Sequence, residues 1–189
     1  EESYDKLFNI NTKSALFLAK AFRKKGRCNP NGASIIFLSS AAALSGEAGI
    51  SEYSASKLAL EGFARSLASE LSKQKIRVNC IAPGVVRTEM TENSLYALTP
   101  EQFLKIQNRH LLGIGKIEDV IGPIVFLLSD YAKWITGVNL SVDGGYTLGW
   151  LRYILKSIVS YFSEKFLDSY FKSENKIITK WNAKYLKEL

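Results

Sequence analysis

A tyrosine and a lysine four residues apart, Tyr53 and Lys57, are the side chains in this chain best suited to proton transfer. If both lie on one helix they share a face. Tyrosine normally loses its proton near pH ~10, and a nearby ammonium favours the phenolate. The pair therefore predicts a tyrosine that exchanges protons near neutral pH. The same spacing is also common on ordinary helix faces, so the surrounding residues must support the assignment.

A serine stands in a position that gives this support. Ser40 lies thirteen residues before Tyr53 and two residues after the apolar run Ile35–Leu38. A short continuous apolar run is typical of a parallel strand that is covered on both faces, so we predict a strand at 34–39. Sheets of this kind bind their ligands at the carboxyl ends of the strands, which is where Ser40 falls.

The pattern S-S-x10-S-E-Y-S-A-S-K, which contains Ser40, Tyr53 and Lys57, resembles the catalytic residues of the short-chain dehydrogenase/reductases. These are a large family of Rossmann-type oxidoreductases. Three more segments agree with the family in order and spacing: LFNIN, VNCIAPGVVRT and ITGVNLSVDGGY. The resemblance covers about residues 4–147, and the pattern is closest to members similar to 3-oxoacyl-(acyl-carrier-protein) reductase.

The resemblance implies an enzyme that transfers hydride between a nicotinamide cofactor, NAD or NADP, and an alcohol or carbonyl substrate. It implies that Tyr53 is the acid/base, that Ser40 stabilises the reacting oxygen and that Lys57 also holds the nicotinamide ribose. Asn11, the asparagine of LFNIN, would hold a water that connects the lysine to solvent.

The turn Pro83-Gly84 follows a second predicted strand at 76–82. Proline and glycine there let the backbone turn sharply and approach a flat ligand. By resemblance the turn faces the nicotinamide ring, and Thr88 hydrogen-bonds the carboxamide. The residues expected to bind the cofactor are Tyr53, Lys57, Pro83, Gly84, Val86 and Thr88.

The fold class is predicted as α/β, a Rossmann-type doubly wound parallel sheet of which only the C-terminal part is present. The strands would lie at about 34–39, 76–82 and 138–142. No Gly-x-x-x-Gly-x-Gly segment occurs in the 189 residues. In the family that turn and the residue that selects NAD or NADP belong to the other half. We therefore expect the chain alone to bind a dinucleotide weakly. The alternative function is a truncated, inactive member that acts as a subunit-contact or scaffold module.

Three helices are predicted from apolar spacing, at 4–25, 51–73 and 115–129. The helix at 4–25 should have a broad buried face, and we expect a homo-oligomer to form through it and the helix at 51–73. The core stripe of that second helix would be Leu60, Phe63, Leu67 and Leu71. The inner face of the helix at 115–129 would be Ile121, Ile124, Val125 and Leu128, with a late start or a kink because of Pro123.

A fourth, short helix is expected from Thr99-Pro100. It lies in the segment 89–112, which by resemblance covers the substrate. His110, the single histidine, is interpreted as a surface or lid residue of that segment.

Residues 148–189 fall outside the family pattern and form a second predicted unit after the domain at 1–147. Eight Lys or Arg against four acids follow Trp150, and apolar residues from Leu151 recur at helical spacing. Such a basic amphipathic helix suits an anionic membrane surface. We favour instead a helix that covers exposed core or a subunit contact. The charge is too modest for nucleic-acid binding, and no motif supports it.

The composition fits an ordinary globular protein, with a net charge of +7. There is no signal-peptide pattern and no run of 18 apolar residues, so we expect a cytoplasmic protein. Cys28 lies in a polar stretch and Cys80 in a predicted strand. Neither a disulfide framework nor a metal site is predicted.

Overall fold

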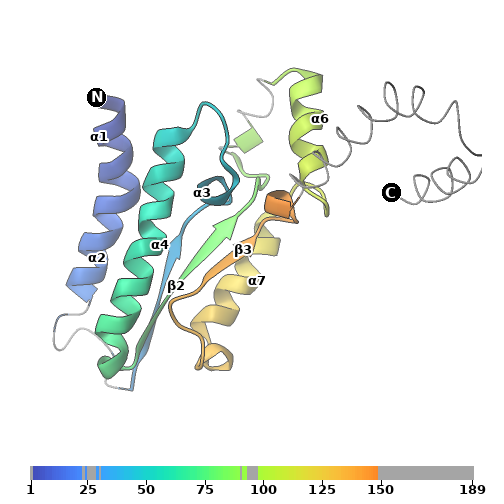
Figure 1. Cartoon of the computed structure of the whole chain (residues 1–189). Helices are drawn as coiled ribbons and strands as arrows, with labels where there is room; N and C mark the ends of the chain where they lie inside the picture. The colour runs from blue at the N-terminus through green and yellow to red at the C-terminus, as the bar shows by residue number, and fades with distance from the viewer. Residues whose placement is uncertain are drawn as a thin grey trace, which may run out of the picture. The chain divides into compact units, whose positions relative to one another are not determined.

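The sheet contains three parallel strands, as the sequence predicts. The structure is a computed structural model and describes residues 2–22, 24, 29, 31–89, 91–92 and 98–148. The strands β1 (Ala33–Leu38), β2 (Ile76–Pro83) and β3 (Asn139–Val142) lie in the order β1-β2-β3 (Figure 1). Among the described residues no strand pairs with the outer edge of β1. Apart from Leu148, the predicted tail lies outside the described residues.

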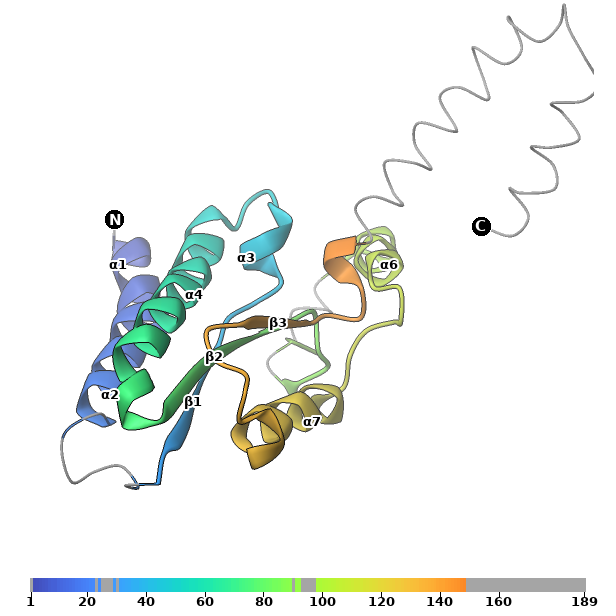
Figure 2. The ribbon, with the colours of Figure 1, turned by 60° about the horizontal axis from the view of Figure 1, so that its bottom comes forward.

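Helices cover both faces of this sheet (Figure 2). On one face lie α4 (Ser51–Leu71) and the continuous run of α1 (Glu2–Phe8), the π-helical η1 (Asn9–Lys13) and α2 (Ser14–Phe22). On the other face lies α7 (Ile117–Leu128). The remaining elements are α3 (Ala42–Ser45), η2 (Ser72–Gln74), α6 (Pro100–Arg109) and η3 (Asp130–Ala132). In the described part of the chain, no helix is both long and apolar enough to cross a membrane.

The main core forms between α4 and the first two strands. The predicted stripe of α4 is confirmed for Leu60, Leu67 and Leu71, which are almost fully buried. They pack in one cluster with strand residues that include Val78 and Cys80. Burial, with the nearby Glu61 carboxylate, raises the pKa of the Cys80 thiol to about 12. Cys80 is therefore an inert core residue at neutral pH.

The broad buried face predicted for the first helix is wrong. Ile10, Phe17 and Leu18 are 61%, 58% and 72% exposed. The helix contacts α4 on one side, while its other side borders a groove of about 590 Å³ along the outer edge of β1. Apolar spacing marks a surface suited to burial, but it does not show which described element covers that surface.

The inner face predicted for α7 is also mostly wrong. Leu127 is buried, with Val120 and Ile124 packed against the same cluster. Ile121, Val125 and Leu128, which the sequence placed inside, are about half exposed. After the two acids of the first turn, every residue from 120 to 128 is apolar, so periodicity could not select a face. The helix begins at Ile117, but Pro123 still lies inside it and beyond its first turn, so the start of the helix does not account for the proline.

Helix α6 begins as predicted. The Thr99 hydroxyl accepts a hydrogen bond from the Gln102 backbone N–H at 3.2 Å, and the Gln102 side chain accepts one from the Thr99 N–H at 2.9 Å. This reciprocal pair is a capping box, and Pro100 fits the first helical position because no N–H is needed there.

The turn after β3 is held by the buried carboxylate of Asp143. It accepts hydrogen bonds from the Gly145 N–H at 3.0 Å and from the Thr147 N–H and hydroxyl at 2.9 and 2.7 Å. Gly144 and Gly145 have φ of 58° and 82°, which favours glycine at both positions. Burial raises the pKa of Asp143, but the hydrogen bonds from Thr147 and Gly145 outweigh it and lower the pKa overall.

Asp143→Asn is expected to make the free energy of unfolding depend less on pH in the acid range. Because the folded pKa lies below the unfolded value of ~3.9, the ionised carboxylate stabilises the fold fully above that value. This stabilisation is lost as the pH falls through the folded pKa. Urea unfolding between about pH 5 and about pH 2 should therefore show a smaller loss in the variant than in the wild type. Asp5→Asn, at an exposed position, is the control, and equal slopes for Asp143→Asn and wild type would refute the assignment.

Candidate active site

Helix α4 presents Tyr53 and Lys57 on one face in its first two turns. The Lys57 Nζ lies 5.9 Å from the centre of the Tyr53 ring and donates a hydrogen bond to the Leu38 carbonyl at 2.9 Å. Burial lowers the pKa of the Lys57 ammonium. The Tyr53 hydroxyl makes no hydrogen bond with any residue that the structure describes. Both side chains therefore sit beside the carboxyl end of β1.

Ser40 lies two residues beyond the end of β1, at the start of α3. Its hydroxyl accepts a hydrogen bond from the Ala42 N–H at 3.2 Å, and its carbonyl accepts one from Ala43 at 3.0 Å. The neighbouring Ala41 N–H donates to the Pro83 carbonyl at 2.8 Å. This bond holds the serine segment next to the end of β2, so Ser40 and the Pro83-Gly84 turn lie at the same edge of the sheet.

Asn11 is brought to the same helix by Ser56. The Asn11 amide donates to the Ser56 hydroxyl at 3.1 Å, and the Thr12 hydroxyl donates to the Ser56 carbonyl at 2.9 Å. The Ser56 hydroxyl in turn donates to the Tyr53 carbonyl at 2.7 Å. Asn11 lies in the π-helical turn η1, and such turns often occur at functional sites. The predicted role of Asn11 in holding a water stays a prediction.

The Pro83-Gly84 turn packs tightly against other parts of this chain. A Cβ atom at Gly84 would lie 2.9 Å from the Asp143 backbone and from the His110 Nε2. Glycine is therefore needed here for contacts within the chain, whether or not a ligand also approaches. Val86 pairs with Gly115 in an isolated parallel bridge, which fixes the backbone that follows the turn.

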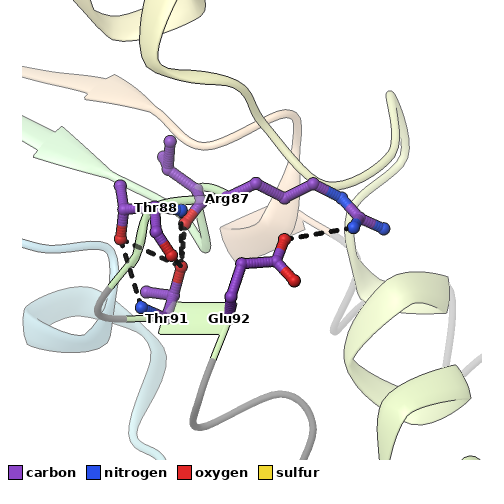
Figure 3. A network of polar contacts seen from close by, with 5 residues as sticks. Arg87, Thr88, Thr91 and Glu92 are labelled. Atoms are coloured by element: carbon purple, nitrogen blue, oxygen red, sulfur yellow. Dashed lines mark hydrogen bonds and ion pairs between the residues drawn. The ribbon is translucent and has the colours of Figure 1, made fainter.

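Thr88 starts a short helical turn. Its N–H donates to the Thr91 hydroxyl at 2.8 Å, and its own hydroxyl accepts from the Thr91 N–H at 3.2 Å. Figure 3 shows the two threonine side chains pointing toward each other, with the exposed ion pair of Arg87 and Glu92 at 3.2 Å beside them. Thr88 thus has a local structural task. Its contact with a nicotinamide carboxamide stays a prediction.

The prediction that His110 is a surface or lid residue is wrong. The side chain is buried, with the residue only 4% exposed. Its Nε2 accepts a hydrogen bond from the Val85 N–H at 3.0 Å, and its Nδ1 lies 2.8 Å from the Ile106 carbonyl. The first bond requires an acceptor and the second a donor, so the ring is neutral with its proton on Nδ1. His110 therefore anchors the end of α6 to the segment after Pro83.

A second anchor of α6 was also missed from the sequence. The Glu47 carboxylate accepts hydrogen bonds from the Tyr146 hydroxyl and the Arg109 guanidinium. Arg109 lies 4.1 Å from the centre of the Tyr146 ring, which also contacts the His110 ring at 4.6 Å. Burial and the Glu47 carboxylate raise the pKa of Tyr146. The cluster joins the loop after α3 to α6 and to the turn after β3. These residues are up to 99 positions apart, so no local pattern could reveal it.

The carboxyl edge of the sheet thus carries Tyr53 and Lys57 on α4, Ser40 in the loop after β1, and the Pro83-Gly84 turn after β2. The arrangement places a phenol, an ammonium and a serine hydroxyl around one edge, which suits proton transfer to an oxygen. No group of acidic, histidine and cysteine side chains that could hold a metal occurs among the described residues.

Comparison with known proteins gives a consistent result over the same part of the chain. A family model described as enoyl-(acyl carrier protein) reductase matches residues 1–147. Dehydrogenase/reductase SDR family member 4 of Homo sapiens is 37% identical over 149 residues, covering 77% of this chain and 51% of that protein. The 3-oxoacyl-(acyl-carrier-protein) reductase of Rickettsia felis is 38% identical over 146 residues, covering 77% and 58%. The chain spans about half the length of the curated relatives it matches.

Solved structures share the fold. A 4-hydroxyisoleucine dehydrogenase mutant complexed with NADH and succinate has a TM-score of 0.72 and 33% identity, covering 78% of this chain and 60% of that one. A short-chain type dehydrogenase/reductase from Mycobacterium ulcerans has a TM-score of 0.68 and 28% identity, covering 78% and 53%. The three-stranded sheet described here therefore corresponds to part of a larger Rossmann-type sheet.

His110→Phe is expected to destabilise the fold by about 1–3 kcal/mol. The phenyl ring can still contact Tyr146, but the Val85 N–H loses its acceptor in a buried place. Urea unfolding measures the difference, with Gln107→Leu at an exposed position of the same helix as the control. Since His110 is the single histidine, its nitrogen NMR signals can be assigned directly and should report the Nδ1-protonated neutral ring. A variant as stable as the control would show that the hydrogen bond does not matter.

Proposed function

The chain belongs to the short-chain dehydrogenase/reductase family, and from that premise we propose that it supplies the catalytic part of an NAD(P)-dependent oxidoreductase. The observation that carries the proposal is the position of Tyr53 and Lys57. They share one face of α4, and Lys57 is hydrogen-bonded to Leu38 at the carboxyl end of β1. Ligands in open parallel sheets bind at this edge.

Tyr53 acts as the acid in the reducing direction. Its hydroxyl gives a proton to the carbonyl oxygen of the substrate while the carbonyl carbon accepts hydride, so the C=O bond becomes a C–OH bond. The Ser40 hydroxyl donates a hydrogen bond to the same oxygen and stabilises its developing negative charge. The Lys57 ammonium favours the phenolate that remains on Tyr53. In the oxidising direction the same phenolate removes the proton from the alcohol.

The residues present fit a nicotinamide cofactor, which supplies or accepts the hydride when bound. Lys57 has three N–H donors and uses one of them on Leu38, so the others can hold ribose hydroxyls. The backbone of Pro83, Gly84 and Val86 and the side chain of Thr88 would lie against the nicotinamide.

The proposed substrate is a small molecule with an alcohol or carbonyl carbon. Two relatives are named a 3-oxoacyl reductase and a 4-hydroxyisoleucine dehydrogenase. Both names contain an oxo or hydroxy group, on two different molecules. Proton transfer by Tyr53 requires only the oxygen on that carbon, so the chemistry of the site sets no narrower class.

A scaffold or subunit-contact role is the second candidate, and the exposed apolar side chains favour it. Ile10, Phe17 and Leu18 on the first helix and Val125 on α7 are more than half exposed. Apolar patches of this kind mark interaction sites. The same surfaces would serve a homo-oligomer of an active enzyme, so catalytic turnover decides between the candidates.

Tyr53→Phe is expected to abolish carbonyl reduction while leaving cofactor affinity nearly unchanged. The change removes the transferable proton and little packing volume. The assays use the protein at its natural length. Turnover is measured as the reduction of a panel of ketones by NADH and NADPH, and cofactor affinity is measured by isothermal titration. Tyr131→Phe, at an exposed tyrosine far from the site in sequence, is the matched control. Retained turnover in Tyr53→Phe would exclude the assigned role.

Lys57→Ala is expected to weaken cofactor binding more than Tyr53→Phe does. The lysine should contact both the ribose and the tyrosine, whereas the phenol makes one contact. The comparison uses isothermal titration with NAD and NADP on both variants and on wild type. Lys133→Ala, at an exposed position, controls for the loss of one positive charge. Equal affinities for the two site variants would argue against the double role of Lys57.

A further inference from the structure

Two buried polar side chains flank Lys57 along α4, and each contacts an element that carries another site residue. Ser56 is fully buried and contacts Asn11, as described above. Glu61 is only 4% exposed, and its neighbours along the helix, Leu60 and Ala64, are buried core residues. A carboxylate is almost never buried in such a place without a polar partner.

The partner of Glu61 is Ser39. The Ser39 hydroxyl lies 3.0 Å from a Glu61 carboxylate oxygen and 3.2 Å from the Lys57 carbonyl oxygen. Its single proton therefore faces two acceptors on α4. The Ser39 N–H donates to the Ile81 carbonyl of β2 at 2.7 Å. Ser39 is thus held by the sheet through its backbone and by α4 through its side chain.

This contact joins the two halves of the candidate site. Ser39 directly precedes Ser40, while Glu61 lies one helical turn beyond Lys57. The Lys57 Nζ bond to Leu38 is a second connection between the same two segments. A shift of the Ser39–Glu61 contact would therefore change where Ser40 stands relative to Tyr53.

We propose that Glu61 is a positioning residue, which through Ser39 fixes Ser40 relative to Tyr53 and Lys57. The inference rests on the proposed oxidoreductase function. Stability alone does not account for a carboxyl group here, because a well-packed apolar side chain would avoid the cost of removing that polar group from water. Position does account for it, since a misplacement of about 1 Å can cost about 100-fold in rate.

The test separates position from stability by using Glu61→Met and Glu61→Gln. Methionine fills the same space without an acceptor, so the variant should remain folded with unchanged or higher resistance to urea. Its kcat should fall about tenfold or more with little change in KM. Glutamine keeps an acceptor oxygen for Ser39 and should restore most of the loss. Glu118→Gln, an exposed acid on α7, controls for the change in charge.

A double-mutant cycle shows whether Glu61 acts through Ser39. Ser39→Ala should lower kcat as Glu61→Met does, and the double variant should be no worse than either single variant. Additive losses would overturn the pathway through Ser39. Unchanged kcat in Glu61→Met, or no difference between Glu61→Met and Glu61→Gln, would overturn the positioning role.

Crystal structures of wild type, Glu61→Met and Glu61→Gln test the positioning role even if no catalytic activity can be measured. If wild type reduces no carbonyl in the panel, the proposed function has failed, and the structures alone decide the positioning role. Glu61→Met should then show Ser40 displaced relative to Lys57, while Glu61→Gln should superpose on wild type. Unmoved Ser40 and an intact Lys57–Leu38 bond in Glu61→Met would overturn the inference.

Discussion

The packing of α4 against β1 and β2 is the contact on which the candidate site depends. Leu60, Leu67 and Leu71 are almost fully removed from water, and burial of one such side chain stabilises a fold by about 1.5–3 kcal/mol. The same helix carries Tyr53 and Lys57 at its amino-terminal end, above the carboxyl edge of the sheet (Figure 1). The packing of these leucines therefore determines where along the sheet α4 lies, and so where Tyr53 and Lys57 are relative to the carboxyl edge.

Apolar packing fixes the position of α4 on the sheet only approximately, and buried polar contacts then restrict that position further. Hydrophobic contacts have no direction, whereas hydrogen bonds require defined distances and angles. Ser56 connects α4 to the turn that carries Asn11, and Ser39 connects it to the strand end that precedes Ser40. Ser56 is next to Lys57 in the helix, and Ser39 contacts the Lys57 carbonyl. These directional hydrogen bonds therefore lie close to Lys57, whose position matters for the proposed chemistry.

The parallel topology explains why distant segments meet. All three strands end at one edge, so the loops that follow them are neighbours. The bond between Ala41 and Pro83 joins the loops after β1 and β2. The buried His110 joins α6 to Val85 in the segment after β2, and the Glu47 carboxylate joins α6 to the loop after α3. The segments that follow the strands are therefore joined to one another and to α6 by a few polar side chains.

The sequence by itself determined the strands, the face shared by Tyr53 and Lys57, the start of α6 and the family, because each depends on neighbours within a few residues or on an ordered set of short motifs. It did not determine which helix faces are covered, so the broad buried face expected for the first helix is wrong, and Ile10 and Leu18 are exposed. In α7, where residues 120–128 are all apolar, it could not separate Leu127 from Leu128. The burial of His110 and the contact of Glu61 with Ser39 were decided by the tertiary structure alone. Such contacts form only when segments far apart in the chain are brought together, and a charged or polar residue has the same local signature whether its partner is water or another side chain.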